Sequence, residues 1–439
     1  MKMTRYFAGR SSIAVALTCA VGTLHAATDA DIDKSFFPYK NAVPTATGVT
    51  AGTVINKGNF ANFEAVLDPG LQRHLQAGAV EITVGKTTSF DINKSYVDAT
   101  RENAGKVKLG AKPGELVGYV AGRPFPEEPD AKDPRAGEKL AWNFRYGMNW
   151  GDGLAISPFY WKYRNMDSGK VERNILFNFH FIKYTHRLNQ APTPEISPNP
   201  SKLYRATYVN VQEPQDVKNT QLLIQRYEDD LKQDDAYLYL GFQRRVRRLS
   251  TGQTTDAFLG SDIMIEDFEG YNGRISDMNW KYKGTVNMLM PFYHHNDMKL
   301  SDEYKEPDGY KYVAFGGQGG CFPDITWQLR KVHVVESSPV DPNHPVSRRV
   351  HYMDAQTSAM SQTLVYDRKG DLWKIFMLGM THPDSHLAQN KDSGIVLFDA
   401  FSMIDVQAKH CTTGQFKGQA DAKMVPVNLF SVQNMRGGN

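Results

Sequence analysis

Long apolar runs are missing from this sequence of 439 residues. After residue 26, no segment has the 18 or more uncharged apolar residues that a membrane-spanning helix needs, so we expect a chain that does not span a membrane. Common catalytic signatures are also missing: there is no G-x-S-x-G, no H-E-x-x-H and no complete G-x-x-x-x-G-K-[ST] loop. These absences count against an enzyme, and we assign no catalytic residue and no cofactor.

A basic excess is missing from the chain after residue 26. Residues 1–26 are predicted to be a secretory signal peptide, with Lys2, Arg5 and Arg10 ahead of a short apolar core and a small-residue cleavage site at 24–26. Removing these three cations leaves 48 Lys and Arg against 48 Asp and Glu. Nucleic-acid-binding proteins usually carry a basic excess, so we expect a periplasmic protein with no nucleic-acid partner.

Cysteine is scarce. The sequence has three cysteines, and Cys19 falls within the predicted signal peptide. The remaining two, Cys321 and Cys411, would lie in an oxidising compartment, where a remaining pair favours one disulfide. The alternative interpretation is a pair of free, buried thiols.

A linker rich in proline, serine and glycine is missing between the two halves of the chain. We therefore expect one domain over residues 27–439. Its first part, residues 27–141, is predicted to be an N-terminal arm with a short helix. That helix begins after Asp68, has Pro69 at its first position and ends at Gly78.

Residues 142–439 are rich in β-strand patterns. Phe177, Phe179 and Phe181 share one side of a predicted strand, while Asn178 and His180 share the other. Successive strands without intervening helices predict antiparallel pairing. Further strands are predicted at residues 203–212, 219–227, 234–248, 277–284, 325–336, 349–353, 362–367, 372–378 and 403–410. We expect a mostly β fold of the α+β class, built on one large antiparallel sheet that curves to bury a face.

Residues 234–284 organise the rest of the chain. In residues 234–248, Leu238, Leu240 and Phe242 alternate with polar positions, which predicts one half-buried strand. The segment near residues 256–272 follows. It is too long and too apolar for a disordered loop, so it must be buried somewhere. We expect it to be a lid segment over the apolar face of the sheet, and ordinary core packing is the alternative.

Several short motifs resemble a bacterial family of outer-membrane-lipoprotein-sorting-like proteins, a large family whose domain has no assigned function. The motifs are QRRVRR at 243–248, DAFLGSD at 256–262, EDF at 266–268, WQLR at 327–330 and YDRKGDLWK at 366–374. The family is similar to the periplasmic lipoprotein carriers LolA and LolB. The resemblance covers most of residues 27–439 and implies an open half-barrel, with the lid segment over its concave face.

The resemblance also implies a function. It is that of a periplasmic carrier that binds a lipid, a lipoprotein acyl chain or another hydrophobic molecule and moves it across the envelope. Genes of such proteins tend to accompany export pumps, which implies an inner-membrane export pump or an outer-membrane protein as partner. An envelope hydrolase or other enzyme using the same cavity, and a non-catalytic envelope assembly protein, are the alternatives.

The ligand is expected to contact the lid segment and the concave face. The residues predicted for this role are Leu238, Leu240, Phe242, Phe258, Leu259, Ile263, Met264, Phe268, Trp280 and Trp327. Arg244 interrupts the apolar side of the predicted strand, and a buried guanidinium needs an anion. We therefore expect Arg244 and Arg248 to latch the lid through Asp262 or Asp267, with an anionic head group as a competitor.

Histidines are the remaining candidates for chemistry. His382, Asp384 and His386 lie close in sequence, and His294, His295 and Asp297 could complete a metal site. Pro383 disrupts helical spacing there, and solvated loop histidines are the simpler interpretation, so no metal is assigned. A nucleophile formed by Cys411 and His410 is weaker still, because Cys411 is predicted to be bonded.

Overall fold

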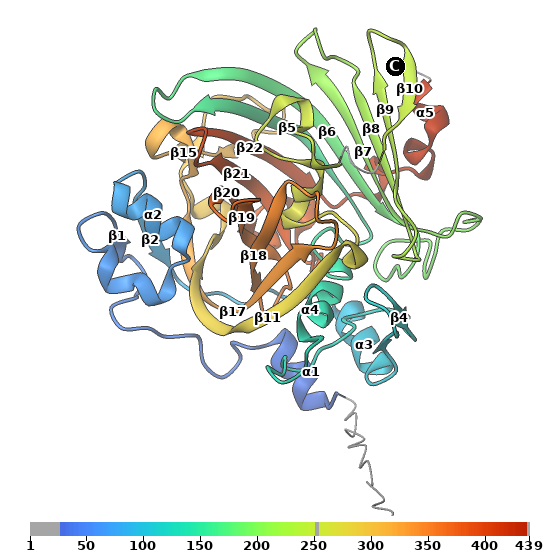
Figure 1. Ribbon diagram of the computed structural model, residues 1–439, viewed down its shortest axis with the longest axis horizontal. Coiled ribbons are helices and arrows are strands. Elements are labelled where there is room, and N and C mark those ends of the chain that lie inside the picture. Colours follow the sequence, from blue (N-terminus) through green and yellow to red (C-terminus); the bar gives the residue numbers. More distant parts are fainter. Residues whose placement is uncertain (1–26, 251–253, 437–439) are drawn as a thin grey trace, which may run out of the picture.

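The computed structural model describes residues 27–250 and 254–436. The predicted signal peptide, residues 1–26, lies outside the described residues. One sixteen-stranded sheet dominates the molecule and curves around its centre (Figure 1). The sheet is not closed, and this confirms the expected mostly β, open architecture.

The sheet runs in the order β1-β2-β17-β18-β19-β20-β21-β22-β5-β6-β7-β8-β9-β10, with β11 paired to β17 and β12 to β20. Its strands are β1 Val54–Ile55, β2 Ile82–Gly85, β5 Gly153–Asn165, β6 Val171–Lys183, β7 Leu203–Glu213, β8 Gln221–Tyr227, β9 Asp235–Leu240, β10 Arg245–Arg248, β11 Met278–Met290, β12 Phe292–Tyr293, β17 Thr326–Pro339, β18 Val346–Asp354, β19 Met360–Asp367, β20 Leu372–Thr381, β21 Leu397–Asp405 and β22 His410–Gln419. The pairs β2–β17 and β12–β20 are parallel, so the sheet is mixed and not purely antiparallel as predicted.

Extra residues at β-bulges accompany the curvature. In β5, the register moves from Ile156 to Phe159 while each neighbouring strand advances by only two residues. In β21, Asp399 is the extra residue between the pairs Gly379–Ala400 and Met380–Phe398. A bulge bends its strand and increases the local twist, so these positions help a long sheet to wrap around one face.

Short elements outside the sheet lie mostly in the first third of the chain. The helices are α1 Asp29–Phe36, α2 Pro69–Ala77, α3 Lys94–Asn103, α4 Ala136–Arg145 and α5 Val432–Arg436, and the short strand pairs are β3 Lys108–Leu109 with β4 Leu116–Val117, β13 Leu300–Ser301 with β14 Tyr312–Val313, and β15 Phe315–Gly316 with β16 Phe322–Pro323. No helix of the described residues is long and apolar enough to cross a membrane.

Helix α2 has the predicted ends. The Asp68 side chain accepts hydrogen bonds from the backbone N–H groups of Gly70 and Leu71, and Gly78 closes the helix with a left-handed φ of 74°. A β-carbon on Gly70 would lie 2.6 Å from Leu364 and 3.0 Å from Ile375. The helix therefore packs closely against strands β19 and β20.

The predicted strand over residues 234–248 is wrong. The chain turns at residues 241–244, where Arg244 has a φ of 49°, and the two halves pair as the hairpin β9–β10. In this hairpin, Arg245 lies opposite Leu240 and Arg247 opposite Leu238. The prediction that Arg244 interrupts the apolar side of one continuous strand is therefore wrong, because Arg244 lies in the turn. The strand predicted over residues 403–410 likewise spans the turn between β21 and β22.

The lid segment, residues 256–272, connects opposite ends of the sheet. The chain leaves the edge strand β10 and next joins the sheet at β11, beside β17 at the other end. Between these strands it forms the short 3-10 turns η3 Phe258–Gly260 and η4 Ile265–Gly270, followed by η5 Ile275–Asp277.

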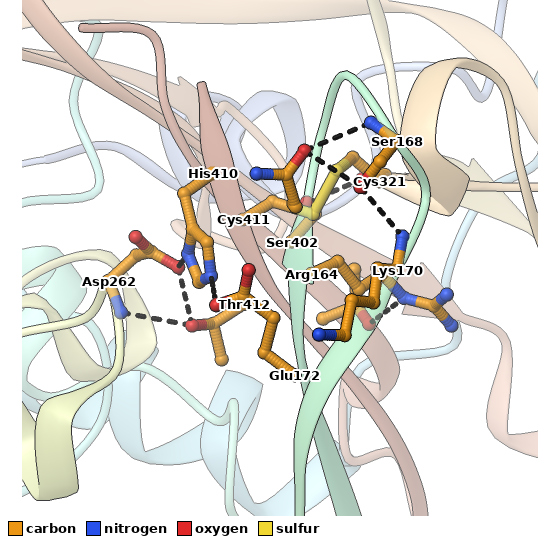
Figure 2. Close-up of a disulfide and its surroundings, with 12 residues drawn as sticks. Arg164, Ser168, Lys170, Glu172, Asp262, Cys321, Ser402, His410, Cys411 and Thr412 are labelled. Carbon is orange, nitrogen blue, oxygen red and sulfur yellow. Dashed lines mark hydrogen bonds and ion pairs between the residues drawn. A yellow bond between two sulfur atoms is a disulfide. The ribbon is translucent and has the colours of Figure 1, made fainter. Parts of the chain in front are cut away.

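Cys321 and Cys411 form a disulfide, as predicted. Both residues are fully buried in the largest hydrophobic cluster. The bond joins the chain just before β16 to the second residue of β22, 90 residues apart in sequence (Figure 2).

Candidate functional site

An aromatic surface covers the inner face of the sheet where β22, β5 and β6 meet. Phe159 and Trp161 come from β5, and Phe177 and Phe179 come from β6. The rings of Trp161 and Phe177 have centroids 4.9 Å apart, and those of Phe159 and Phe179 are 5.1 Å apart. These are ordinary separations for edge-to-face aromatic pairs, so the rings form one continuous apolar surface.

Gly414 makes room for the aromatic surface. It lies in β22 between Phe401 of β21 and Trp161 of β5 in the strand register. A β-carbon there would lie 2.1 Å from the Phe401 ring and 2.8 Å from the Phe159 ring. Only glycine therefore lets the rings from β21 and β5 meet across β22.

The lid segment lies on this surface. Phe258 and Phe268 are buried, and their ring centroids are 5.6 Å apart. The Phe258 ring is 6.0 Å from Trp161, and the Phe268 ring is 5.9 Å from Phe179. Burying these two rings against β5 and β6 therefore contributes to holding the segment in place through the hydrophobic effect.

Ion pairs also hold the lid segment. The Arg349 guanidinium of β18 is fully buried and donates to Glu266 at 2.8 Å and to Asp267 at 2.8 Å and 3.2 Å. His344 contacts the same Glu266 oxygen at 3.0 Å. Burial alone raises the pKa of Glu266, but Arg349 and His344 outweigh it and lower that pKa to about 2.

A second anchor lies beside the disulfide. Asp262 accepts hydrogen bonds from the Thr412 hydroxyl and from Nδ1 of His410, both at 2.7 Å, and its backbone N–H donates to the Thr412 hydroxyl at 2.9 Å. Figure 2 shows that His410 and Thr412 flank the bonded Cys411 on β22. The hydrogen bond to Asp262 raises the pKa of His410. Lys374 of β20 donates to the backbone carbonyl of Asp262.

A third anchor lies at the end of the lid segment. Glu269 pairs with Arg205 of β7 at 3.1 Å, and Arg205 also donates to the Asn272 side chain at 2.8 Å. Residues 256–272 therefore contact strands β5, β6, β7, β18, β20 and β22 through rings, charges or hydrogen bonds.

An apolar cavity of about 50 Å³ remains between the lid segment and the sheet. It is lined by Trp150, Ile156, Phe159, Trp161, Phe179, Phe181, Ile263, Phe268, Glu269, Phe376, Leu378, Phe398 and Phe401. Ligand pockets usually measure about 300–1,000 Å³. In this structure, side chains of the lid segment therefore occupy most of the space above the aromatic surface.

The predicted ligand-binding residues separate into groups. Ile263 and Phe268 line the cavity, and Phe258 packs beside it. Met264 packs instead against Val346 and Val365, and Leu259 is only partly buried, with a φ of 51°. The ligand contact of these five residues remains a prediction.

The other predicted residues do not line the cavity. Leu238 and Leu240 are half-buried near the β10 edge, and the Phe242 side chain is 73% exposed in the β9–β10 turn. Trp280 packs with Tyr271 and α4, and Trp327 lies opposite Val84 of β2. The turn after Leu240 explains the error at Phe242, because it ends the strand that would have buried the ring.

The predicted latch is also wrong. Arg244 is exposed in the β9–β10 turn, and Arg248 pairs with Asp235 on the neighbouring strand. Asp262 and Asp267 bond His410 and Arg349 instead. The anions of the lid segment were identified correctly from the sequence, but their partners lie about 80 to 150 residues further along the chain.

Within residues 27–250 and 254–436, two groups of histidine and carboxylate could be considered for a metal ion: His295 with His386 and Asp399, and His382 with Asp91 and Asp384. In the buried group, Nδ1 of His295 lies 2.5 Å from Asp399. The Asn390 amide donates to Nδ1 of His386, so Nε2 carries the ring proton and donates to Tyr310 at 2.9 Å. A metal would need the lone pair of that Nε2, so these residues form a hydrogen-bonded network that does not fit a metal ion in this arrangement.

The sequence left several site residues unassigned. Phe179 and Phe181 were visible as a period-two pattern in β6, and that pattern could have identified the cavity wall. Arg349, His410 and Glu269 carried no such signal, because their roles depend on contacts between distant segments.

Comparisons with known proteins place the chain in a family. A family model described as "Protein of unknown function (DUF1329)" matches residues 54–436. Two solved structures, each at 17% identity, cover 69% of this chain and 100% of their own. One is a Vibrio parahaemolyticus domain whose name relates it to outer membrane lipoprotein sorting (TM-score 0.46), and the other a DUF1329 family protein from Desulfovibrio piger (0.47). A LolA superfamily protein from Nitrosomonas europaea has 10% identity over 64% of this chain and 91% of its own, with a TM-score of 0.36. No curated protein matches the chain.

Proposed function

The chain belongs to the DUF1329 family, and from this premise we propose that it is a carrier for a hydrophobic molecule in the cell envelope. The observation that carries the proposal is the aromatic surface of an open sheet, covered by one discrete segment. Trp161, Phe179 and Phe401 form an apolar wall of a kind that binds acyl chains or other apolar groups. The lid segment protects this wall from water when no ligand is bound.

The anchors of the lid segment support a binding cycle. The apolar residues Ile263 and Phe268 of the segment line the cavity. Asp262, Glu266 and Asp267 hold the segment on the sheet through polar contacts. Because the charged contacts and the apolar contacts are made by different residues of the segment, a ligand can replace the apolar contacts without disturbing the sheet. The Cys321–Cys411 disulfide supports an oxidising compartment such as the periplasm as the place of action.

Mass spectrometry of gently purified, exported protein tests the proposal. We expect a co-purified lipid or similar molecule, released on denaturation, and saturable binding of a fluorescent hydrophobic probe. Phe268→Glu places a charge in the cavity and should weaken probe binding at least about ten-fold, while Phe242→Glu, in the exposed turn, should leave it unchanged. A wild-type protein that binds neither lipid nor probe would contradict the carrier function.

An enzyme of the envelope is the second candidate. A separate cavity of about 260 Å³ is lined by His295, Tyr310 and His386, and Asp399 orients His295 through Nδ1. This orientation leaves the other ring nitrogen of His295 suited to accept a proton. Hydrolysis of short-chain ester substrates, lost in His295→Gln, would favour this candidate. An equal background rate in both proteins would contradict it.

A further inference from the structure

A lysine follows the row of aromatic side chains on one face of β6. Phe177, Phe179, Phe181 and Lys183 follow one another at every second position, so they share one face of the strand. Phe179 and Phe181 line the apolar cavity, and Lys183 lies one step beyond it. The wall of the cavity therefore changes from apolar to positively charged at the end of β6.

A second cation lies directly opposite the first. Lys183 of β6 pairs in register with Arg205 of β7. Like charges in directly opposite positions of neighbouring strands destabilise a sheet. Arg205 is compensated by Glu269, whereas the described contact of the Lys183 ammonium is one carbonyl, that of Gly147 at 3.4 Å. Burial lowers the pKa of Lys183 to about 8, and the neighbouring carboxylates of Asp152 and Glu269 offset only part of this effect.

A small cavity of about 20 Å³, lined in part by charged side chains and called the polar cavity below, adjoins the apolar one at this point. Trp150, Phe181 and Glu269 line both cavities, and Arg145, Asp152, Lys183 and Arg205 line only the polar one. Arg145 is held by Asp230 at 2.8 Å, and one oxygen of Asp152 accepts three backbone N–H bonds. Lys183 and Arg205 therefore face the junction of the cavities beside two carboxylates, Asp152 on the side of the polar cavity and Glu269 of the lid segment at the junction itself.

Glu269 occupies this junction in a costly conformation. Its φ is 62°, in the left-handed region that non-glycine residues rarely adopt. Such backbone strain persists only where surrounding contacts impose it, and it often marks a switching segment. Here the contact is the pair with Arg205, which places the carboxylate of the lid segment beside the two cations.

We propose that the cavity takes a single-chain amphiphile with an anionic head group. The apolar tail would lie on the aromatic surface, and a carboxylate or phosphate would bind Lys183 and Arg205 in place of Glu269. This inference rests on the proposed carrier function and specifies its ligand. The head group would displace the carboxylate of the lid segment, so binding and opening of the lid would be coupled through one exchange of anions.

Binding of four ligands with the same sixteen-carbon chain tests the proposal: palmitate, hexadecyl phosphate, hexadecanol and hexadecyltrimethylammonium. We expect at least one of the two anions to bind about ten-fold or more tighter than the alcohol, and the cation to bind most weakly. Preference for palmitate assigns a fatty-acid-like head group, and preference for hexadecyl phosphate assigns a phosphorylated one.

Two variants with opposite expectations strengthen the test. Lys183→Met should weaken anion binding about ten-fold and leave hexadecanol unchanged, whereas Glu269→Gln should strengthen anion binding by removing the competing carboxylate. Lys170→Met, at the exposed loop before β6, is the matched control and should change neither. If Lys183→Met does not fold, Glu269→Gln alone decides the question.

The outcomes separate this inference from the carrier function. If none of the four ligands binds but the wild-type protein still binds the fluorescent hydrophobic probe, the single-chain amphiphile is overturned and the carrier function stands. If the probe does not bind either, the carrier function itself is wrong. If all four bind with equal affinity, or if Lys183→Met and Glu269→Gln shift the anions and the alcohol alike, the carrier function stands and the anionic head group is overturned.

Discussion

Arg349 binds two of the four acidic side chains through which the lid segment is anchored. Its guanidinium is fully buried and bonds both Glu266 and Asp267. Removing one partner of a buried ion pair leaves the other charge without compensation in a poorly solvated site, which is far more costly than losing a surface pair. We therefore expect Arg349 to be required for the observed position of the lid segment.

Arg349→Met should lower the free energy of unfolding by about 3–5 kcal/mol, because two buried carboxylates lose their cation. Arg348→Met is the matched control. Arg348 is at the preceding position of β18 and is partly exposed. It lies 3.7 Å from Glu336 and over the Tyr366 ring, so its loss should cost only about 1–2 kcal/mol. Urea denaturation of both variants gives the comparison, and equal losses would refute the role assigned to Arg349.

His410 gives the lid segment a pH dependence. Its ring lies 2.7 Å from Asp262 and 3.5 Å from Glu172, and the hydrogen bond to Asp262 raises its pKa. A raised pKa in the folded protein means that the stabilisation is complete below the ordinary histidine value of about 6.5. It is lost as the pH rises through the raised value, when the ring becomes neutral.

Hydrogen exchange of residues 256–272 should therefore be faster at pH 9 than at pH 5, beyond the intrinsic effect of pH on exchange. His410→Gln keeps a hydrogen-bond donor but cannot titrate, so it should remove most of the difference. A wild-type and variant protein with the same pH profile would show that another group is responsible.

At the scale of elements, the disulfide supports both the core and the lid segment. It closes a loop between residues 90 positions apart and places Cys411 between the two residues that hold Asp262. Loss of the bond increases the conformational entropy of the unfolded chain and removes a constraint next to the contacts of Asp262.

Cys411→Ser should lower the free energy of unfolding by about 2–5 kcal/mol and also speed exchange in the lid segment. Cys321→Ser removes the same bond without altering β22, so it is the matched comparison. Thermal unfolding in the absence and presence of a reductant measures the effect. A wild-type protein whose melting temperature does not respond to reduction would contradict the expected contribution.

Local patterns predicted the elements that depend on neighbours in sequence. The period-two run at Phe177–Phe181 gave β6, and Asp68 with Gly78 gave the ends of α2. The hairpin at residues 241–244 was missed because alternation continues on both sides of the turn and Arg244 is an uncommon residue for a positive φ. Burial of the lid segment was predictable from its composition, whereas Arg349 and His410 approach it only through folding of the whole sheet.

At the scale of the whole molecule, the open sheet leaves two edges, and the lid segment is the part of the chain that connects them. The sheet is stabilised by long strand ladders, while the lid segment is held by a limited set of side-chain contacts. Such a segment can open at a lower free energy than the sheet can unfold.

Binding of a ligand should therefore raise the rate of hydrogen exchange in residues 256–272 and leave the rates in strands β18–β22 unchanged. The reason is that the ligand replaces the apolar contacts of Phe258 and Phe268 but not the backbone ladder. Exchange measured by mass spectrometry with peptide resolution tests this. A uniform rise across the sheet would indicate general destabilisation instead of local opening.

The lid segment runs from β10 to β11 without contributing a strand to the sheet, so we expect that it could be replaced by the same segment of a related chain. One continuous stretch carries the apolar cover, the Asp262 anchor and the Glu269 carboxylate, and it begins and ends outside the strand ladder. Transplanting residues 256–272 between related chains would therefore transfer selectivity as a unit, provided that the recipient keeps cations at the positions of Arg205 and Arg349.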